Sequence, residues 1–239
     1  MHIIQSIKYT KYCAGVIWNN WHKTRQTYSQ HGEDIFIENL LGHNSVRSFI
    51  DVGANDGVLF SNTYKFAKNG ARGLCFEPSK TTYLKLRLNH LFHHNVKCFR
   101  QAVSNMNGNA PFIEDGYEAI LSRLGSESFN NKNRVRVQTV TLESVLRKYR
   151  SFNEIDLLSV DVEGHEREVL EGLDGGSFKS RIIILESDKT NIESVLSVPI
   201  LQDYIPRYTN GVNLILTHKN LSHLSKKFTQ EELGGFQCF

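Results

Sequence analysis

Residues 46–57 read VRSFIDVGANDG, and this stretch decides the fold. Its apolar run, residues 46–52, predicts a buried strand. The strand leads directly into a turn that contains Gly53 and Gly57, where the chain can turn tightly and approach a ligand closely. A strand, a glycine turn and a following helix begin a fold of alternating strands and helices. In such folds ligands bind at the carboxyl ends of the strands.

Further apolar strands alternate with helical stretches along the chain. The expected strands are residues 73–76, 96–103, 134–140, 155–160 and 181–185, and the expected helices are residues 61–68, 81–91, 142–149 and 166–173. The second helix is expected to bury Leu84, Leu88 and Leu91, which fall on one stripe. The polar interval 104–133 is expected to be an insertion made of a loop and short strands.

The end of the chain has a different pattern. Segments 201–208 and 212–217 flank Asn210 and Gly211, which predicts an antiparallel hairpin. The sequence therefore predicts an α/β fold with a doubly wound, mostly parallel sheet that an antiparallel C-terminal hairpin completes.

The composition fits one large domain with a short appendage. The chain has 239 residues, of which 40% are hydrophobic and 22% charged. We expect a helical appendage over residues 1–27 and a single domain over residues 28–239. The net charge of +3 is too small to indicate a nucleic-acid partner.

Membrane and zinc signals are absent from the sequence. No window approaches the about 20 apolar residues of a membrane span. The four cysteines form no CxxC pair and no zinc-ligand spacing. Reduced thiols fit a cytoplasmic protein.

An acidic residue follows the second strand. Glu77 comes about twenty residues after the glycine turn, where a carboxylate can accept hydrogen bonds from both ribose hydroxyls. The spacing of Gly53 and Gly57 differs from the G-x-G-x-x-G of dinucleotide folds. Asp51 and Asp56 would repel a pyrophosphate but suit the cationic groups of S-adenosylmethionine. The sequence therefore favours this cofactor over NAD or FAD.

Three acids and a histidine follow the strand at 155–160. In this DVEGHE stretch His165 is the first candidate for a general base, with a helix cap as the competing interpretation. Glu163 is a second candidate base or a clamp on the substrate, and Asp161 is expected to orient the cofactor's ammonium group or the acceptor. A divalent metal held by Asp161 and other carboxylates stays an alternative, but no distinctive ligand set points to one, so no metal is assigned.

These stretches together resemble the FkbM family of methyltransferases. The matching pieces are YSQHGED (28–34), FIDVGANDG (49–57), CFEPSK (75–80), QAVSN (101–105), VQTVTLESVL (137–146), IDLLSVDVEGHEREVLEG (155–172) and IIILES (182–187). DVEGHE is the most specific of them, since the glycine turn occurs across all class I methyltransferases. The resemblance implies a Rossmann-like class I fold with a seven-stranded sheet.

The resemblance also implies positions for the cofactor. Asp51, Gly53 and Asn55 would line its methionine part, and Glu77 would hold the ribose. The residues implied beside the adenine are Pro78, Ser79, Val103 and Ser104.

Two further segments are assigned by resemblance. Gln30, Glu33 and Asp34 would close over the amino acid end of the cofactor. Ser122 lies in a segment that resembles a serine-bearing family segment, and is a candidate for the substrate pocket together with Glu163.

The expected reaction is transfer of a methyl group to a hydroxyl of a sugar, glycan or secondary metabolite, leaving S-adenosylhomocysteine. The alternative is N-methylation of an amide or amine in a peptide natural product. Nucleic-acid methylation would call for an Asn/Asp-Pro-Pro loop where DVEG stands, so no nucleic-acid acceptor is expected. The intact acids argue against a non-catalytic binding protein. The sequence assigns no oligomeric state.

Overall fold

A computed structural model describes residues 15, 25–113, 123–124, 134–173, 177–186, 192–221, 233 and 235–239. Most of the appendage expected over residues 1–27 lies outside the described residues, as does Ser122. No helix within the described ranges is long and apolar enough to cross a membrane.

The central sheet has the order β12-β10-β11-β9-β8-β1-β2-β3. Its strands are β1 (Ser48–Val52), β2 (Arg72–Phe76), β3 (Val96–Phe99), β8 (Glu154–Val160), β9 (Lys179–Glu186), β10 (Tyr204–Thr209), β11 (Asn213–His218) and β12 (Gln237–Cys238). Strands β3, β2, β1, β8 and β9 are parallel, while β11 runs antiparallel to both of its neighbours, β9 and β10. This order confirms the predicted doubly wound sheet with its C-terminal hairpin. The difference is an eighth strand, the two-residue β12, which pairs with the edge of β10.

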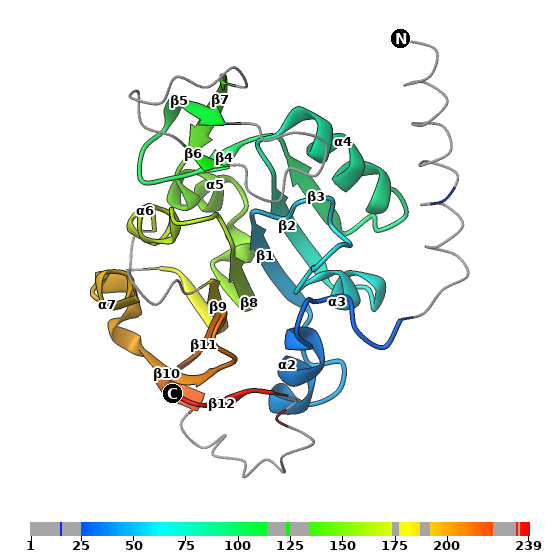
Figure 1. Ribbon diagram of the computed structural model, residues 1–239, viewed down its shortest axis with the longest axis vertical. Coiled ribbons are helices and arrows are strands. Elements are labelled where there is room, and N and C mark those ends of the chain that lie inside the picture. Colours follow the sequence, from blue (N-terminus) through cyan, green and yellow to red (C-terminus); the bar gives the residue numbers. More distant parts are fainter. Residues whose placement is uncertain are drawn as a thin grey trace.

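Helices cover both faces of this sheet (Figure 1). One face carries α2 (Glu33–Leu41), α3 (Tyr64–Lys68) and α4 (Lys80–Asn89), and the other carries α5 (Leu142–Lys148), α6 (Glu166–Glu171) and α7 (Ile192–Leu196). Short 3₁₀ helices lie at Arg150–Phe152, Pro199–Asp203 and Lys219–Leu221.

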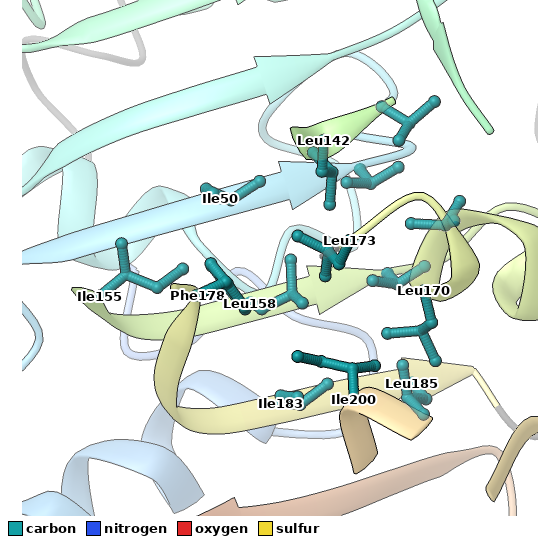
Figure 2. Packing of buried hydrophobic residues seen from close by; sticks show 14 of the residues in the cluster. Ile50, Leu142, Ile155, Leu158, Leu170, Leu173, Phe178, Ile183, Leu185 and Ile200 are labelled. Carbon is teal, nitrogen blue, oxygen red and sulfur yellow. The ribbon is translucent and has the colours of Figure 1, made fainter. Parts of the chain in front are cut away.

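Alternate strand residues supply two separate cores, because successive side chains point to opposite faces of a sheet. Phe49 and Leu157 pack with Phe36 of α2 on one face. Ile50 and Leu158 belong to the core on the other face. Figure 2 shows this second core, in which Leu142 and Leu170 come from helices and meet the strand residues. Burial on both faces explains why these strands read as nearly continuous apolar runs.

The strand predicted at residues 96–103 is in fact two strands. β3 ends at Phe99, and β4 (Ala102–Val103) belongs to a second sheet with β5 (Gly108–Ile113), β6 (Arg123–Leu124) and β7 (Arg134–Val140) in the order β4-β7-β5-β6. The polar pair Arg100-Gln101 marks the point where the chain leaves the central sheet. The predicted insertion therefore builds a sheet of its own beside the carboxyl edge of the main one.

The stripe predicted for the helix at 81–91 is also wrong. Leu84 and Leu91 are 37% and 53% exposed, whereas α4 buries Thr82, Leu86 and Asn89. The two stripes have the same spacing, so periodicity alone cannot separate them. Asn89 can be buried because its amide donates to the carbonyl of Asp56 at 2.7 Å.

Candidate active site

A cavity of about 320 Å³ opens at the carboxyl edge of the central sheet. This volume lies in the range of sites for small ligands and cofactors. The predicted site residues that line it are Gln30, Asp51, Gly53, Asn55, Glu77, Pro78, Val103, Asp161, Glu163 and His165. The structure thus gathers residues from four strand ends and from the segment before β1.

The turn after β1 fits between its two neighbouring strands. Gly53 has φ of 83°, and its N–H donates to the carbonyl of Phe76 at 3.1 Å. A Cβ atom at Gly53 would lie 1.7 Å from the carbonyl oxygen of Asp161. The turn therefore requires glycine for two reasons, its left-handed backbone and its contact with the end of β8.

Asp51 belongs to β1, directly before this turn, and lines the cavity. Its carboxylate accepts a 2.6 Å hydrogen bond from Oγ1 of Thr63. Burial raises the pKa of Asp51 to about 6, although the Thr63 hydrogen bond acts in the opposite direction. A cationic ligand group placed nearby would favour the ionised form of this carboxyl.

Glu77 lines the cavity directly after β2 and is buried. Its Oε1 atom accepts a 2.7 Å hydrogen bond from the N–H of Ser79. The Ser79 side chain faces away from the cavity and caps α4, because its Oγ accepts from the N–H of Thr82. Of the predicted adenine residues, Pro78 and Val103 line the cavity, and Ser79 and Ser104 do not.

Three carboxyl groups gather at the ends of β8 and β9. Oxygen atoms of Asp161, Glu163 and Glu186 lie within 4.8 Å of one another. Oxygens this close repel when all three groups are ionised, so the cluster is stabilised when it holds a proton or another positive charge. Glu186 is not among the site residues predicted from the sequence. The signal was present, since Glu186 directly follows the predicted strand 181–185.

The DVEGHE turn is held by a buried carboxylate. Oε1 of Glu166 accepts hydrogen bonds from the N–H groups of Val162 at 3.2 Å and Gly164 at 3.1 Å. Within this turn Glu163 has φ of 56°, a conformation that costs a non-glycine residue energy. Glu166 thus helps to fix the backbone that directs Glu163 into the cavity.

His165 lines the cavity with both ring nitrogens near protein partners. Its Nε2 lies 3.0 Å from Oγ of Ser104, and its Nδ1 lies 3.4 Å from Oε2 of Glu168. His165 occupies the N-cap position of α6 but its side chain makes no capping hydrogen bond. The competing interpretation as a helix cap therefore does not describe its contacts.

Of the residues predicted at the amino acid end of the cofactor, Gln30 lines the cavity and Glu33 and Asp34 do not. The Asp34 carboxylate accepts from Thr27 Oγ1 at 2.6 Å and from Ser29 Oγ at 2.9 Å. Asp34 thereby shapes the segment that carries Gln30.

Glu33 instead reaches the C-terminal hairpin. Its Oε1 accepts from the side-chain amides of Asn210 at 2.9 Å and Asn213 at 2.7 Å. Its Oε2 accepts from the N–H of His31 at 2.9 Å. Glu33 therefore joins the segment before β1 to the hairpin loop, whose Val212 lines the cavity.

An apolar edge that the sequence did not reveal borders the cavity. It consists of Leu59, Phe60 and Val212, whose exposed fractions are 43%, 45% and 38%. Phe60 has φ of 59°, and its backbone forms an isolated parallel bridge with Ser29. The other lining residues absent from the prediction are Val52, Ala54, Ser61, Asn62, Phe76, Gln101, Ala102, Phe112, Ser159 and Val162.

The sheet order and the cavity at its carboxyl edge define an α/β protein of the doubly wound class, with its ligand site at the strand ends. A sequence profile of the methyltransferase FkbM domain matches residues 51–210. The chain belongs to the FkbM methyltransferase family.

A curated relative is methyltransferase sdnD of Sordaria araneosa, which is 32% identical over 155 residues. The match covers 52% of this chain and 60% of that protein, so this chain spans about 60% of the relative's length.

Among solved structures, the chain is similar to an O-methyltransferase from Bacillus cereus in complex with SAH. The TM-score is 0.43 at 12% identity, over 87% of this chain and 90% of that one. A precorrin-6y C5,15-methyltransferase from Geobacter metallireducens has a TM-score of 0.43 at 11% identity, over 82% and 93%.

Proposed function

We propose that the cavity binds S-adenosyl-L-methionine and that the enzyme transfers its methyl group to a hydroxyl of a sugar, glycan or secondary metabolite. The observation that carries this proposal is the contact between Gly53 and Asp161. This contact places two features at the same cavity. One is the glycine turn, which suits the cofactor, and the other is the group of carboxyls, which suits an acceptor. The product would be S-adenosyl-L-homocysteine.

The residues that line the cavity suit this cofactor. Because Gly53 has no side chain, its turn packs directly against the Asp161 carbonyl and the backbone of the turn lines the cavity. Glu77 offers a carboxylate to ribose hydroxyls, and Asp51 offers one to the cofactor's positive groups. When bound, the cofactor supplies a methyl group carried on a sulfonium.

The chain's own residues would orient the acceptor and take up its proton. A hydroxyl is a weak nucleophile near neutral pH and gains from a base within hydrogen-bond reach. Asp161, Glu163 and His165 line the cavity. Asp161 and Glu163 are the proposed catalytic groups, with Glu163 also available to clamp the acceptor, and His165 would hold the turn that carries them. The carboxyl groups that line the cavity would repel an acidic acceptor. These groups belong to Asp51, Glu77, Asp161, Glu163 and Glu186.

The same carboxyls support a second candidate, an amine or amide acceptor in a peptide natural product. An ammonium group would be attracted to Asp161, Glu163 and Glu186, although it would have to lose a proton before methylation. An acceptor panel separates the two candidates.

The test uses S-adenosylmethionine with a deuterated methyl group and matched acceptors that carry a hydroxyl, an amine or a carboxylic acid on the same scaffold. Mass spectrometry should find the label on oxygen of the hydroxyl compounds. Label on nitrogen alone would support the second candidate. Asp161→Asn serves as the control, since it should bind the cofactor and transfer far less label.

Calorimetry tests the cofactor directly. We expect S-adenosylhomocysteine to bind with a dissociation constant in the micromolar range, about −8 kcal/mol. Glu77→Ala should weaken this binding at least tenfold. Preferential binding of NAD would contradict the proposal.

A further inference from the structure

Glu186 stands beside Asp161 because of the register of two parallel strands. The last paired residues of β8 and β9 are Val160 and Leu185. Asp161 and Glu186 follow them, and an oxygen of each carboxyl group lies within 4.8 Å of an oxygen of the other. Two carboxyl groups held this close can hydrogen-bond to each other only when one of them carries a proton.

We propose that Asp161 and Glu186 share one proton and act together as the base of the reaction, with the protonated Glu186 holding the Asp161 carboxylate in place. This inference rests on the proposed function. Glu186 is a positioning residue in this arrangement, and Asp161 is the group that meets the acceptor. Both line the cavity.

The proposed methyl transfer conserves atoms and charge. The acceptor oxygen forms a bond to the methyl carbon while the bond from that carbon to sulfur breaks, and the bonding pair stays on sulfur. The hydroxyl proton passes to the Asp161 carboxylate. The acceptor leaves as a neutral ether, and solvent later removes the proton from the pair.

The surroundings of the pair favour a retained proton. Burial, followed by the charge of Asp161, raises the pKa of Glu186 to about 8. Asp161 is exposed at the cavity, but the protein atoms around its carboxyl keep water away, and with the charge of Glu163 this raises its pKa to about 6. The groups that face the pair are acidic, namely Glu163 beside it, Asp51 from β1 and Glu166 from α6.

Two further contacts locate the pair within the site. The N–H of Glu163 donates to the Glu186 carboxyl, which ties Glu186 to the DVEGHE turn. His165 lies on the same turn, with its ring nitrogens directed to Ser104 and Glu168. The shared proton therefore lies at the point where the turn, β8 and β9 meet.

Calorimetry can count this proton without an acceptor. The probe is sinefungin, in which an amine-bearing carbon replaces the methylated sulfur, and the control ligand is S-adenosylhomocysteine, which lacks that positive charge. Each is titrated near pH 7.5 in buffers of different ionisation enthalpy. The cationic probe should expel up to about one proton from the pair, and the control should expel close to none.

Glu186→Gln tests the pair itself, because its amide can still donate to Asp161 and accept from Glu163. It should bind sinefungin without releasing the proton, and Asp161→Asn should behave in the same way. Glu163→Gln, in the same cavity but outside the pair, should still release it.

Equal proton counts for both ligands, or an undiminished count in Glu186→Gln, would overturn the shared proton and leave the proposed function standing. If neither ligand binds the wild type, the proposed function fails as well.

Discussion

The Nε2 atom of His165 lies 3.0 Å from the Oγ atom of Ser104. This contact ties the turn after β8 to the strand that opens the second sheet, since the N–H of Ser104 donates to the carbonyl of Val140. With Glu168 near its other ring nitrogen, His165 has protein partners on both sides. Its position therefore favours a role in holding the site together.

His165→Ala should lower the free energy of unfolding by about 1–2 kcal/mol, because it removes a partner from Ser104 and Glu168. Turnover should fall less than tenfold. Ser104→Ala removes the first contact from the other side and should destabilise by a similar amount. A fall in kcat of ~10²–10⁴ with unchanged cofactor binding would instead assign the base to His165.

Gly53→Ala should abolish cofactor binding and destabilise the fold by about 2–4 kcal/mol. The new Cβ would collide with the Asp161 carbonyl, and the backbone at φ of 83° would be strained. Gly211→Ala is the matched control, since Gly211 has φ of 87° and no atom within 4 Å of the point where a Cβ would lie. It should cost about 1 kcal/mol and retain binding. Melting curves and calorimetry give both quantities, and equal effects of the two variants would contradict this account.

Much of the site could be predicted because its signals are local. The DVGANDG turn, Glu77 and the DVEGHE stretch each follow a strand, and β2, β1 and β8 are neighbours in the sheet. The carboxyl ends of neighbouring parallel strands meet at one edge, so these residues had to converge. Glu186 obeys the same rule.

The rest depends on contacts that no local pattern contains. Glu33 meets Asn213 across 180 residues of sequence, and this contact brings Val212 to the cavity. The buried face of α4 was misjudged because a polar residue, Asn89, is buried through a hydrogen bond to a distant carbonyl. The spacing of apolar residues predicts which side chains are buried, but it does not show whether a polar side chain finds a hydrogen-bond partner that allows it to be buried.

Glu33→Gln should lower the free energy of unfolding by about 1–3 kcal/mol. The amide oxygen can replace one carboxylate oxygen toward Asn210 and Asn213, but the amide nitrogen would then face the N–H of His31. Urea unfolding measures the loss. Glu143→Gln, which removes an exposed pair with Arg147, should change stability by less than about 0.5 kcal/mol. Equal midpoints for wild type and Glu33→Gln would show that Glu33 does not brace the hairpin.

Phe60→Gly should move stability and activity in opposite directions. Removing the side chain relieves the strain of the left-handed backbone at φ of 59°. Glycine also makes the unfolded chain more flexible, which opposes this gain, so the net stabilisation should be at most about 1 kcal/mol. It also removes an apolar surface at the edge of the cavity, so KM for the acceptor should rise. Asn44→Gly relieves a similar backbone, at φ of 57°, away from the cavity lining. It should leave KM unchanged, and a matching rise in KM there would remove Phe60 from acceptor binding.

The unfolding free energy of the ligand-free protein should fall as the pH rises from about 6.5 to 8.5. Glu186 keeps its proton to about pH 8 in the folded state, whereas an unfolded glutamate loses it near pH 4.5. The folded state therefore binds more protons in this window, and stability must decrease as the proton is lost.

Other groups act below this pH window or at its lower end. The raised pKa values of Asp51 and Asp161, both about 6, lie below it. Burial lowers the pKa of His90 to about 3, so this histidine acts with the opposite sign, and only up to about its unfolded pKa of 6.5. In Glu186→Gln the fall should nearly disappear, because the amide does not titrate. Urea midpoints at several pH values across the window measure both slopes. Among the carboxyls of the described residues, Glu186 has its raised pKa inside this pH range. If the unfolding free energy of wild type and of Glu186→Gln fell equally with pH, Glu186 would not hold the proton.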